Sequence, residues 1–190
     1  MIQSRPAWLR TLKNITAIAA GSNHMLAMDR NGVVVAWGCG QQNQLGRRVV
    51  ERLKTVGLTP VTVKLARKAV KIACGSYHSF AIDEHGLVYA WGLNNFGMTG
   101  ISDGTGEDHA AILKPTLVDS LRGYRIVDIT GGEHHSVACT EDGRLLAWGR
   151  ADGSQSGVSR DRLTDDNAVI DDKGSPRILS RPEILPGWFT

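Results

Sequence analysis

The chain has 190 residues, of which 42% are hydrophobic and 22% are charged, and its formal net charge is +3. This is the composition of an ordinary soluble protein with enough apolar residues for a core. It excludes a membrane-spanning helix, because no apolar run approaches the roughly 18 residues required, and residues 1–13 lack the apolar core of a secretory signal.

One sequence pattern occurs three times along the chain. The copies begin at Gly21, Gly75 and Gly132, which are 54 and 57 residues apart, and none contains an insertion. Each copy has a Gly-x-x-His turn, a polar turn that ends in glycine, an Ala-Trp-Gly triplet and one further glycine. The repeated histidines and tryptophans are His24, His78 and His135, and Trp37, Trp91 and Trp148. A period of this length predicts that each copy is one supersecondary unit that stacks on its neighbours.

The repeats divide the chain into successive segments. In order, we expect a lead-in that ends a preceding unit (1–14), repeat 1 with a basic loop at 47–57 (15–63), repeat 2 (64–118), repeat 3 with a long polar loop at 151–177 (119–185), and the start of a further unit (186–190). An open arc of three units exposes two sheet edges, which ordinarily invite pairing with another chain. We therefore expect the sequence to be a fragment of a larger protein.

Each repeat predicts four strands. The first strand is a β-rich run at 15–20, 69–74 and 126–130; the second follows the histidine turn, and the third runs to the tryptophan. The glycine between the second and third strands supplies the positive φ of a tight hairpin. A fourth strand is predicted to begin at Pro60, Pro115 and Pro182, because proline at a strand start removes no ladder hydrogen bond. Four antiparallel strands per repeat predict an all-β fold of β-propeller blades, with a β-solenoid as the structural alternative.

The repeated histidines do not predict a metal site. Each occupies the same place in its own unit, whereas metal ligation needs imidazole nitrogens about 2 Å from one ion. We expect each histidine to hydrogen-bond to the backbone of its turn, and each tryptophan to pack between blades. No nucleophile-elbow, HExxH, P-loop or dinucleotide fingerprint is present, so we expect no covalent catalysis, no cofactor and no small-molecule substrate. An enzyme site in the propeller channel remains an alternative without a catalytic motif to support it.

Cysteine usage and charge distribution bear on location and partners. The three cysteines are too few and too scattered for a disulfide framework, which favours a reducing compartment, the cytosol or the nucleus. Residues 47–71 hold eight lysines and arginines against Glu51 alone. Such a segment is a candidate surface for a polyanion or an acidic protein, or else a solvated loop with no partner.

The segments 19–24 (AAGSNH) and 36–47 (AWGCGQQNQLGR) resemble the regulator of chromosome condensation repeat family, and residues 15–157 fit its repeat. The resemblance is strongest to the chromatin-bound nucleotide exchange factors for the small GTPase Ran, which residues 131–137 also resemble. It implies a seven-bladed β-propeller, of which about three blades are present here.

The family's exchange factors bind Ran on one face of the propeller and the nucleosome on the other, in the nucleus. They stabilise the nucleotide-free GTPase without covalent chemistry. The resemblance therefore implies a Ran exchange factor docked on chromatin, and we expect the isolated three-blade chain to be inactive. The alternative is a protein-interaction scaffold of the same superfamily that does not catalyse exchange.

Positions that match the family's functional residues are the candidate sites. The resemblance implies GTPase binding by Asn23, Tyr77 and His134, each directly before a repeat histidine, and by Arg47. Asn23 departs from the family, whose exchange factors tend to carry an aspartate there, and this departure favours the non-exchange alternative.

The loop 48–57 matches the segment that reaches the acidic histone patch of the nucleosome. Its candidate anchors are Arg48, Arg52 and Lys54, and DNA is a further candidate contact. Arginine suits this role because its guanidinium binds carboxylates with two parallel hydrogen bonds.

Overall fold

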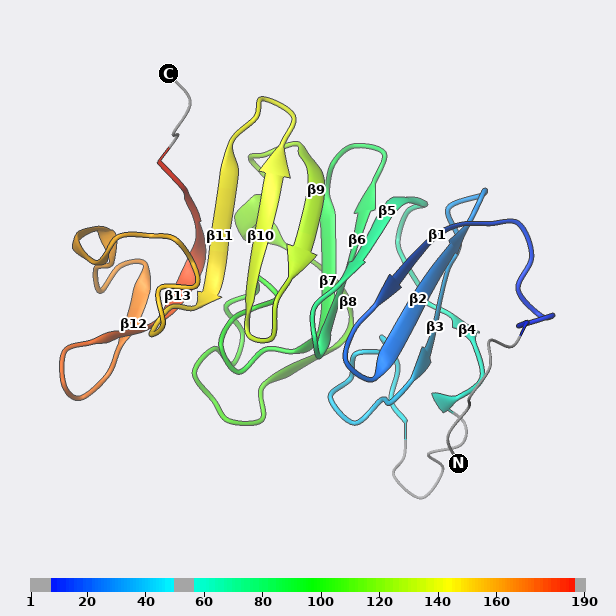
Figure 1. Cartoon of the computed structure of the whole chain (residues 1–190), viewed down its shortest axis with the longest axis horizontal. Helices are drawn as coiled ribbons and strands as arrows, with labels where there is room; N and C mark the ends of the chain where they lie inside the picture. The colour runs from blue at the N-terminus through cyan, green and yellow to red at the C-terminus, as the bar shows by residue number, and fades with distance from the viewer. Residues whose placement is uncertain (1–7, 50–56, 187–190) are drawn as a thin grey trace.

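The computed structural model describes residues 8–49 and 57–186. Three antiparallel β-sheets stand side by side in chain order (Figure 1). Blade 1 contains β1 (Ile15–Ala20), β2 (His24–Asp29), β3 (Val34–Gly38) and β4 (Val61–Thr62). Blade 2 contains β5 (Ala69–Cys74), β6 (His78–Asp83), β7 (Val88–Leu93) and β8 (Ala111–Leu117). Blade 3 contains β9 (Ile126–Gly131), β10 (His135–Thr140), β11 (Leu145–Arg150), β12 (Ala168–Ile170) and β13 (Pro176–Ile184).

Each sheet corresponds to one sequence repeat, which confirms the prediction of β-propeller blades. The inner strands β1, β5 and β9 lie next to one another, and β4, β8 and β12 form the outer edges. Among the described residues, the short 3-10 helices η2 (Asp119–Leu121) and η3 (Arg160–Arg162) lie in the connections. Within the described ranges, no helix has the length and apolar character needed to cross a bilayer.

The hairpins between the second and third strands form as predicted. Gly32, Gly86 and Gly143 have φ values of 75°, 76° and 83°, which a side chain would disfavour. In blade 2, Asp83 Oδ1 accepts hydrogen bonds from the backbone N–H groups of His85 and Leu87. These two hydrogen bonds stabilise the hairpin turn that contains Gly86.

The position predicted for proline is wrong in the fourth strands of blades 2 and 3. β8 begins four residues before Pro115, and β13 begins six residues before Pro182. Both prolines lie where the register of the outer strand shifts against its neighbour. A bulge leaves a residue unpaired, so the missing proline N–H removes no ladder hydrogen bond there.

The segment 151–177, predicted as a long polar loop, carries regular structure. It includes η3 and β12, and β12 pairs with β13 through Ala168–Leu179 and Val169–Ile178. Blade 3 therefore has five strands, where the repeat pattern predicted four. A strand of three residues is too short to give a readable alternating pattern in the sequence.

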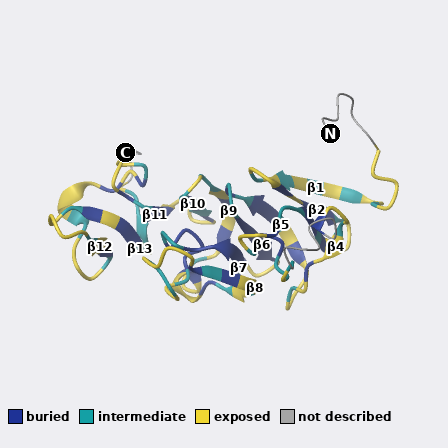
Figure 2. Cartoon of the chain, turned by 90° about the horizontal axis from the view of Figure 1, so that it is seen from below, coloured by how far each residue is buried: buried dark blue, intermediate teal, exposed yellow. Residues whose placement is uncertain are grey.

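The hydrophobic core lies between neighbouring sheets (Figure 2). Trp91 of blade 2 is completely buried against Leu26 and Leu45 of blade 1. Trp148 of blade 3 is equally buried against blade 2, and its ring meets Phe80 edge-on at a centroid distance of 6.3 Å. The prediction that the repeated tryptophans pack between blades is confirmed at these two positions.

The repeated histidines join one blade to the next. His24 Nε2 lies 2.8 Å from Ser79 Oγ of blade 2, and Ser79 Oγ donates to Gln44 O of blade 1. Trp91 Nε1 donates to the same carbonyl oxygen at 2.9 Å. Blades 2 and 3 repeat this arrangement, with the residues His78, Ser136, Met98 and Trp148. The prediction of a backbone partner is wrong for His24 and His78, because the ring nitrogen meets a serine hydroxyl of the next blade.

The histidines at these junctions are uncharged. Ser79 uses its hydrogen for Gln44 O, so His24 Nε2 must donate to the serine oxygen. Burial lowers the pKa of His24 from 6.5 to about 4. Burial, together with the neighbouring histidines, lowers the pKa of His78 from 6.5 to about 3. Both rings are therefore neutral in the folded chain at neutral pH.

We expect stability to fall as the pH is lowered from 7 to 5. A depressed folded-state pKa means that the unfolded chain binds the proton first, so the stabilisation is complete above pH 6.5 and declines below it. At pH 5 the loss is about 2 kcal/mol for each buried histidine. Urea unfolding at pH 7, 6 and 5 measures this. The decline should shrink in His78→Asn and persist in His85→Asn, whose ring is exposed; equal unfolding free energies at pH 7 and 5 would contradict the neutral junctions.

Candidate functional site

The turns that precede the three repeat histidines form one continuous edge, here called the rim (residues 21–24, 75–78 and 132–135). Ser22 N donates to Ser76 O at 3.1 Å, and Ser76 N donates to Gly132 O at 3.0 Å. Because both hydrogen bonds cross between blades, the turns are held side by side at the same end of the inner strands. Asn23, Tyr77 and His134 occupy equivalent places on this rim.

The glycine of each Ala-Trp-Gly triplet fixes the rim in place. Gly92 has φ 106°, and a Cβ atom there would lie 2.5 Å from Tyr77 O. The missing side chain lets the next residue reach that oxygen, since Leu93 N donates to Tyr77 O at 3.0 Å. The other blades repeat this contact, from Cys39 N to Asn23 O at 2.7 Å and from Arg150 N to His134 O at 2.8 Å. The glycine of each triplet is thus required for the hydrogen bond that holds the backbone carbonyl of each candidate residue.

The three rim side chains differ in exposure and chemistry. Asn23 is exposed, whereas Tyr77 and His134 are half-buried. An amide at position 23 can donate and accept hydrogen bonds but carries no charge. The rim therefore offers the phenol ring of Tyr77 in its middle, the imidazole of His134 at one end and the neutral amide of Asn23 at the other.

Arg47 does not lie on the rim. Its guanidinium donates to Ala36 O at 3.0 Å and to Thr59 O at 3.3 Å, so it braces the loop after the tryptophan against blade 1. Burial lowers the pKa of Arg47. Arg48 beside it is exposed, and Arg52 and Lys54 lie outside the described residues.

A group of residues that the sequence analysis did not identify adjoins His134. Phe96, from the loop after β7, packs against the His134 ring with centroids 4.8 Å apart. The Arg150 guanidinium lies 5.1 Å from the centre of the Phe96 ring, and that of Arg177 lies 5.5 Å from it. We call Phe96, His134, Arg150 and Arg177 the Phe96 cluster. It draws one side chain from blade 2 and three from blade 3.

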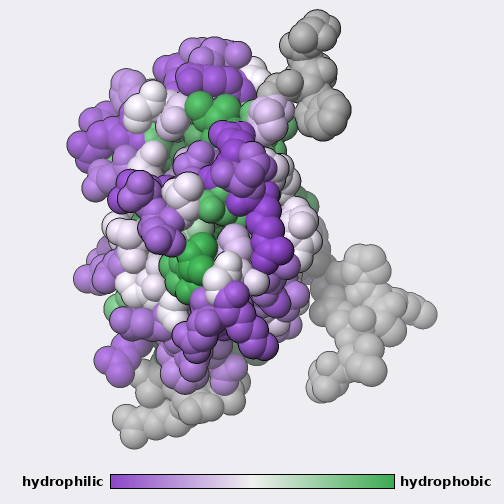
Figure 3. Space-filling model, turned by 90° about the vertical axis from the view of Figure 1, so that its left-hand side faces the viewer, coloured by the Kyte–Doolittle hydropathy of each residue, from purple (hydrophilic) through white to green (hydrophobic). Residues whose placement is uncertain are grey.

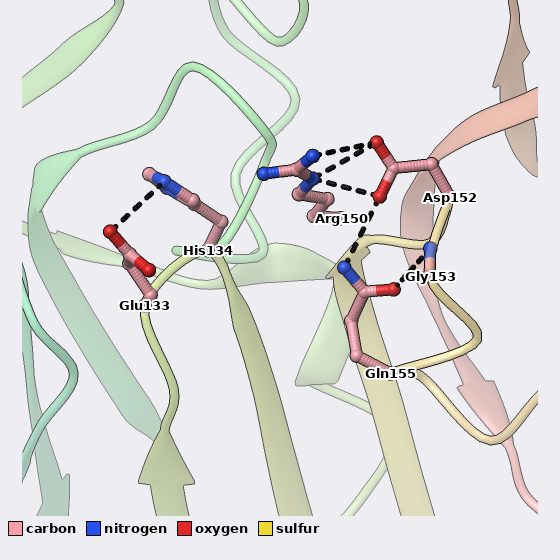
Figure 4. Close-up of polar contacts among 6 residues, drawn as sticks. All are labelled: Glu133, His134, Arg150, Asp152, Gly153 and Gln155. Carbon is pink, nitrogen blue, oxygen red and sulfur yellow. Dashed lines mark hydrogen bonds and ion pairs between the residues drawn. The ribbon is translucent and has the colours of Figure 1, made fainter.

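Two carboxylates border the Phe96 cluster (Figure 4). Arg150 binds Asp152 with three N–H···O contacts of 2.8, 2.9 and 3.0 Å. Gln155 Nε2 also donates to Asp152, at 3.3 Å. Glu133 lies on the other side of His134, with 3.7 Å between Glu133 Oε1 and His134 Nε2. Arg150 is therefore paired with Asp152, while Glu133 contacts the cluster only through His134.

The surroundings of His134 favour its neutral form. Burial lowers its pKa, and the positive charge of Arg150 and the neighbouring His135 act in the same direction. The carboxylates of Glu133 and Asp152 oppose this effect without reversing it. A neutral imidazole can both donate and accept a hydrogen bond, which suits recognition of a polar protein surface.

The sequence did contain a signal for part of the Phe96 cluster. Arg150 directly follows Trp148-Gly149, at the offset held by Cys39 and Leu93 in the other repeats. The residue after this triplet donates to the carbonyl of the rim residue, so its side chain starts beside the rim. Within the described ranges, no three histidine, cysteine or acidic side chains come together in a way that could hold a metal ion.

The repeated antiparallel blades, packed against one another around shared cores, define an all-β fold of the β-propeller type. The RCC1-like domain family model matches residues 1–186, and the chain belongs to this family.

Relatives with solved structures or curated descriptions agree with this assignment. Protein pim1 of Schizosaccharomyces pombe is 48% identical over 97% of this chain, which corresponds to 34% of pim1. The guanine nucleotide exchange factor SRM1 of Saccharomyces cerevisiae is 41% identical over 79% of this chain and 31% of its own length. The crystal structure of Prp20p from S. cerevisiae, a protein studied for its binding to Gsp1p and histones, has 38% identity and a TM-score of 0.83 over 95% of this chain and 40% of Prp20p. The chain thus spans about a third of the length of these curated relatives.

Proposed function

We propose that the rim binds a small GTPase of the Ran type and that the chain is part of a guanine nucleotide exchange factor. The observation that carries this proposal is the joining of Asn23, Tyr77 and His134 into one hydrogen-bonded rim. The relative SRM1 is an exchange factor, and Prp20p binds Gsp1p. The match to Prp20p covers 95% of this chain and so includes the rim.

The proposed mechanism requires no covalent step. An exchange factor accelerates nucleotide release by binding the nucleotide-free GTPase more tightly than the nucleotide-bound one. A rim that bound both states with equal affinity would not change the rate of nucleotide release, however tight the binding. Tyr77 and His134 supply stacking and neutral hydrogen-bonding groups for that differential contact, and Asn23 supplies an amide.

A second candidate is an interaction scaffold without exchange activity. Two observations favour it: Asn23 lacks the charge that the family's exchange factors tend to carry, and the Arg47 guanidinium is held by backbone carbonyls of its own blade. Such a scaffold would use the same rim but would bind its partner irrespective of nucleotide.

We further propose that the chain docks on chromatin in the nucleus through its basic loop. Arg48, the first residue of this loop, is exposed, and Arg52 and Lys54 complete the proposed anchor. Prp20p, which binds histones, supports the same assignment. Charge reversal at Arg48 should weaken binding to histone dimers and leave GTPase binding unchanged. If histone binding does not change, the loop is a solvated surface without this partner.

The affinity of this chain for the two states of the GTPase distinguishes the candidates. With Gsp1p as the Ran-type probe, we expect the nucleotide-free form to bind at least about 100-fold more tightly than the GTP-bound form. Equal affinities for the two forms would support the scaffold. Absence of binding to either form would contradict both.

A further inference from the structure

A hollow of about 440 Å³ lies on blade 3, next to the Phe96 cluster. Its lining includes the buried residues Ala151 and Val158, Arg160 of η3, and the start of β13. Four charged side chains border it, namely Asp152, Arg160, Asp171 and Arg177. The chemistry of the hollow depends on which of these groups already have partners.

The two carboxylates are engaged within the chain. Asp152 is bound by Arg150, whose guanidinium offsets its charge. Asp171 Oδ1 accepts hydrogen bonds from the backbone N–H groups of Lys173 at 2.9 Å and Ser175 at 2.8 Å, and so closes the β12–β13 turn. Because both carboxylates already have partners, we do not expect the hollow to select a cationic ligand.

The two arginines are less fully engaged, although the positive charge of Arg177 acts on Asp152. Within the described ranges, neither the Arg160 nor the Arg177 guanidinium lies within ion-pair distance of an acidic side chain. Arg160 donates to Ser175 Oγ at 2.8 Å, and Arg177 lies over the Phe96 ring. Each contact orients the guanidinium while leaving N–H donors for a ligand. The four charged side chains that line the hollow sum to zero, and Arg150, which pairs with Asp152 beside it, adds one positive charge.

The surroundings indicate a polar ligand from a protein. This end of the molecule is covered mainly by hydrophilic side chains, with only small hydrophobic areas (Figure 3). The hollow is continuous with the rim, because Phe96 contacts both Arg177 and His134. A protein bound on the rim would therefore present its neighbouring surface to Arg160 and Arg177.

We propose that this hollow binds an acidic segment of the protein that occupies the rim, with Arg160 and Arg177 pairing with its carboxylates. Phe96 acts as a positioning residue that holds Arg177 over its ring. The identity of the occupant rests on the proposed GTPase-binding function, whereas the carboxylate chemistry of the hollow does not. Arginine pairs of this kind bind carboxylates through parallel hydrogen bonds.

An acidic peptide tests the chemistry of the hollow directly. The probe is acetyl-Gly-Glu-Asp-Glu-Gly-amide, with the Gln-Asn-Gln version as a neutral control, titrated into the whole chain at low salt. We expect the Nε–Hε NMR signals of Arg160 and Arg177 to shift with the acidic peptide only, and the shifts to disappear in high salt. Arg177→Gln should weaken peptide binding about 3- to 5-fold.

Arg181 is the matched control, because it is an exposed arginine four residues further along β13 and does not line this hollow. Arg181→Gln should bind the peptide as the unchanged chain does, and Phe96→Tyr should restore binding that Phe96→Leu reduces. Shifts that are equal for Arg177 and Arg181, or that survive Arg177→Gln unchanged, would overturn the proposal. So would shifts that appear only with a DNA duplex.

The occupant is tested separately with nucleotide-free Gsp1p. We expect Arg177→Gln to weaken this complex about 3- to 5-fold and to reduce the salt dependence of the association rate. If the peptide binds but the Arg177→Gln complex with Gsp1p is unchanged, the assignment of the occupant is wrong. If the unchanged chain binds the peptide but not Gsp1p, the proposed function fails while the carboxylate site stands.

Discussion

Replacing Trp91 with alanine is expected to lower the free energy of unfolding by about 3–5 kcal/mol. The indole is completely buried between blades 1 and 2, so its removal leaves a cavity that the surrounding strands cannot close. The substitution also removes the N–H that donates to Gln44 O, a buried carbonyl that joins the two blades. Urea unfolding followed by circular dichroism measures the change.

The chain provides its own control for this prediction. Trp8 is 81% exposed, and Trp8→Ala is expected to change stability by no more than about 0.5 kcal/mol. Trp91→Phe should fall between the two, because it keeps most of the buried ring and loses only the hydrogen bond to Gln44 O. If Trp91→Ala and Trp8→Ala had similar unfolding free energies, the tryptophan would not be what joins the blades.

The double variant Tyr77→Ala/His134→Ala is expected to bind nucleotide-free Gsp1p about 100-fold more weakly. Half-buried aromatic groups in an interface commonly contribute more than about 1 kcal/mol each, and two losses of about 1.4 kcal/mol correspond to this factor. Both side chains lie on the rim, whose backbone is held by Gly92 and Gly149 and should survive the substitutions. Surface-based binding measurements at fixed salt give the affinities.

A matched pair of substitutions at the opposite end of the blades controls for nonspecific effects. His85 lies in the β6–β7 turn and Tyr124 lies just before β9, both remote from the rim. The variant His85→Ala/Tyr124→Ala should bind Gsp1p within about 2-fold of the unchanged chain. Equal weakening by both double variants would place the binding surface elsewhere on the molecule.

Local sequence patterns predicted the strands, whereas the candidate residues of the rim were implied by the family resemblance. The β-rich runs and the hairpin glycines depend on alternation and on positive φ, which are properties of a few adjacent residues. Tyr77 and His134 could be placed on a common edge because they hold the same offset from the repeat histidine, and stacked repeats bring equal offsets together. The outer strands were predicted less well, because the bulges that accommodate Pro115 and Pro182 depend on pairing with the neighbouring strand.

The Phe96 cluster and the histidine junctions could not be derived from one repeat. Phe96 comes from the loop of blade 2 and meets His134 only because blade 3 packs beside it. His24 likewise finds its partner in Ser79, a residue of the next blade. Met25 occupies the serine position in the first repeat, so the sequence showed this serine in only two of three copies. Contacts between repeats thus required the relative placement of the blades.

Nucleotide release tests the central claim most directly. Because the chain spans about a third of its curated relatives, we would replace the matching segment of SRM1 with this chain and follow the release of a fluorescent guanine nucleotide from Gsp1p. We expect the chimera to accelerate release, the Tyr77→Ala/His134→Ala chimera to lose most of that acceleration, and the isolated chain to remain inactive. A folded chimera that binds Gsp1p without accelerating release would contradict the exchange function and would identify the rim as that of a scaffold.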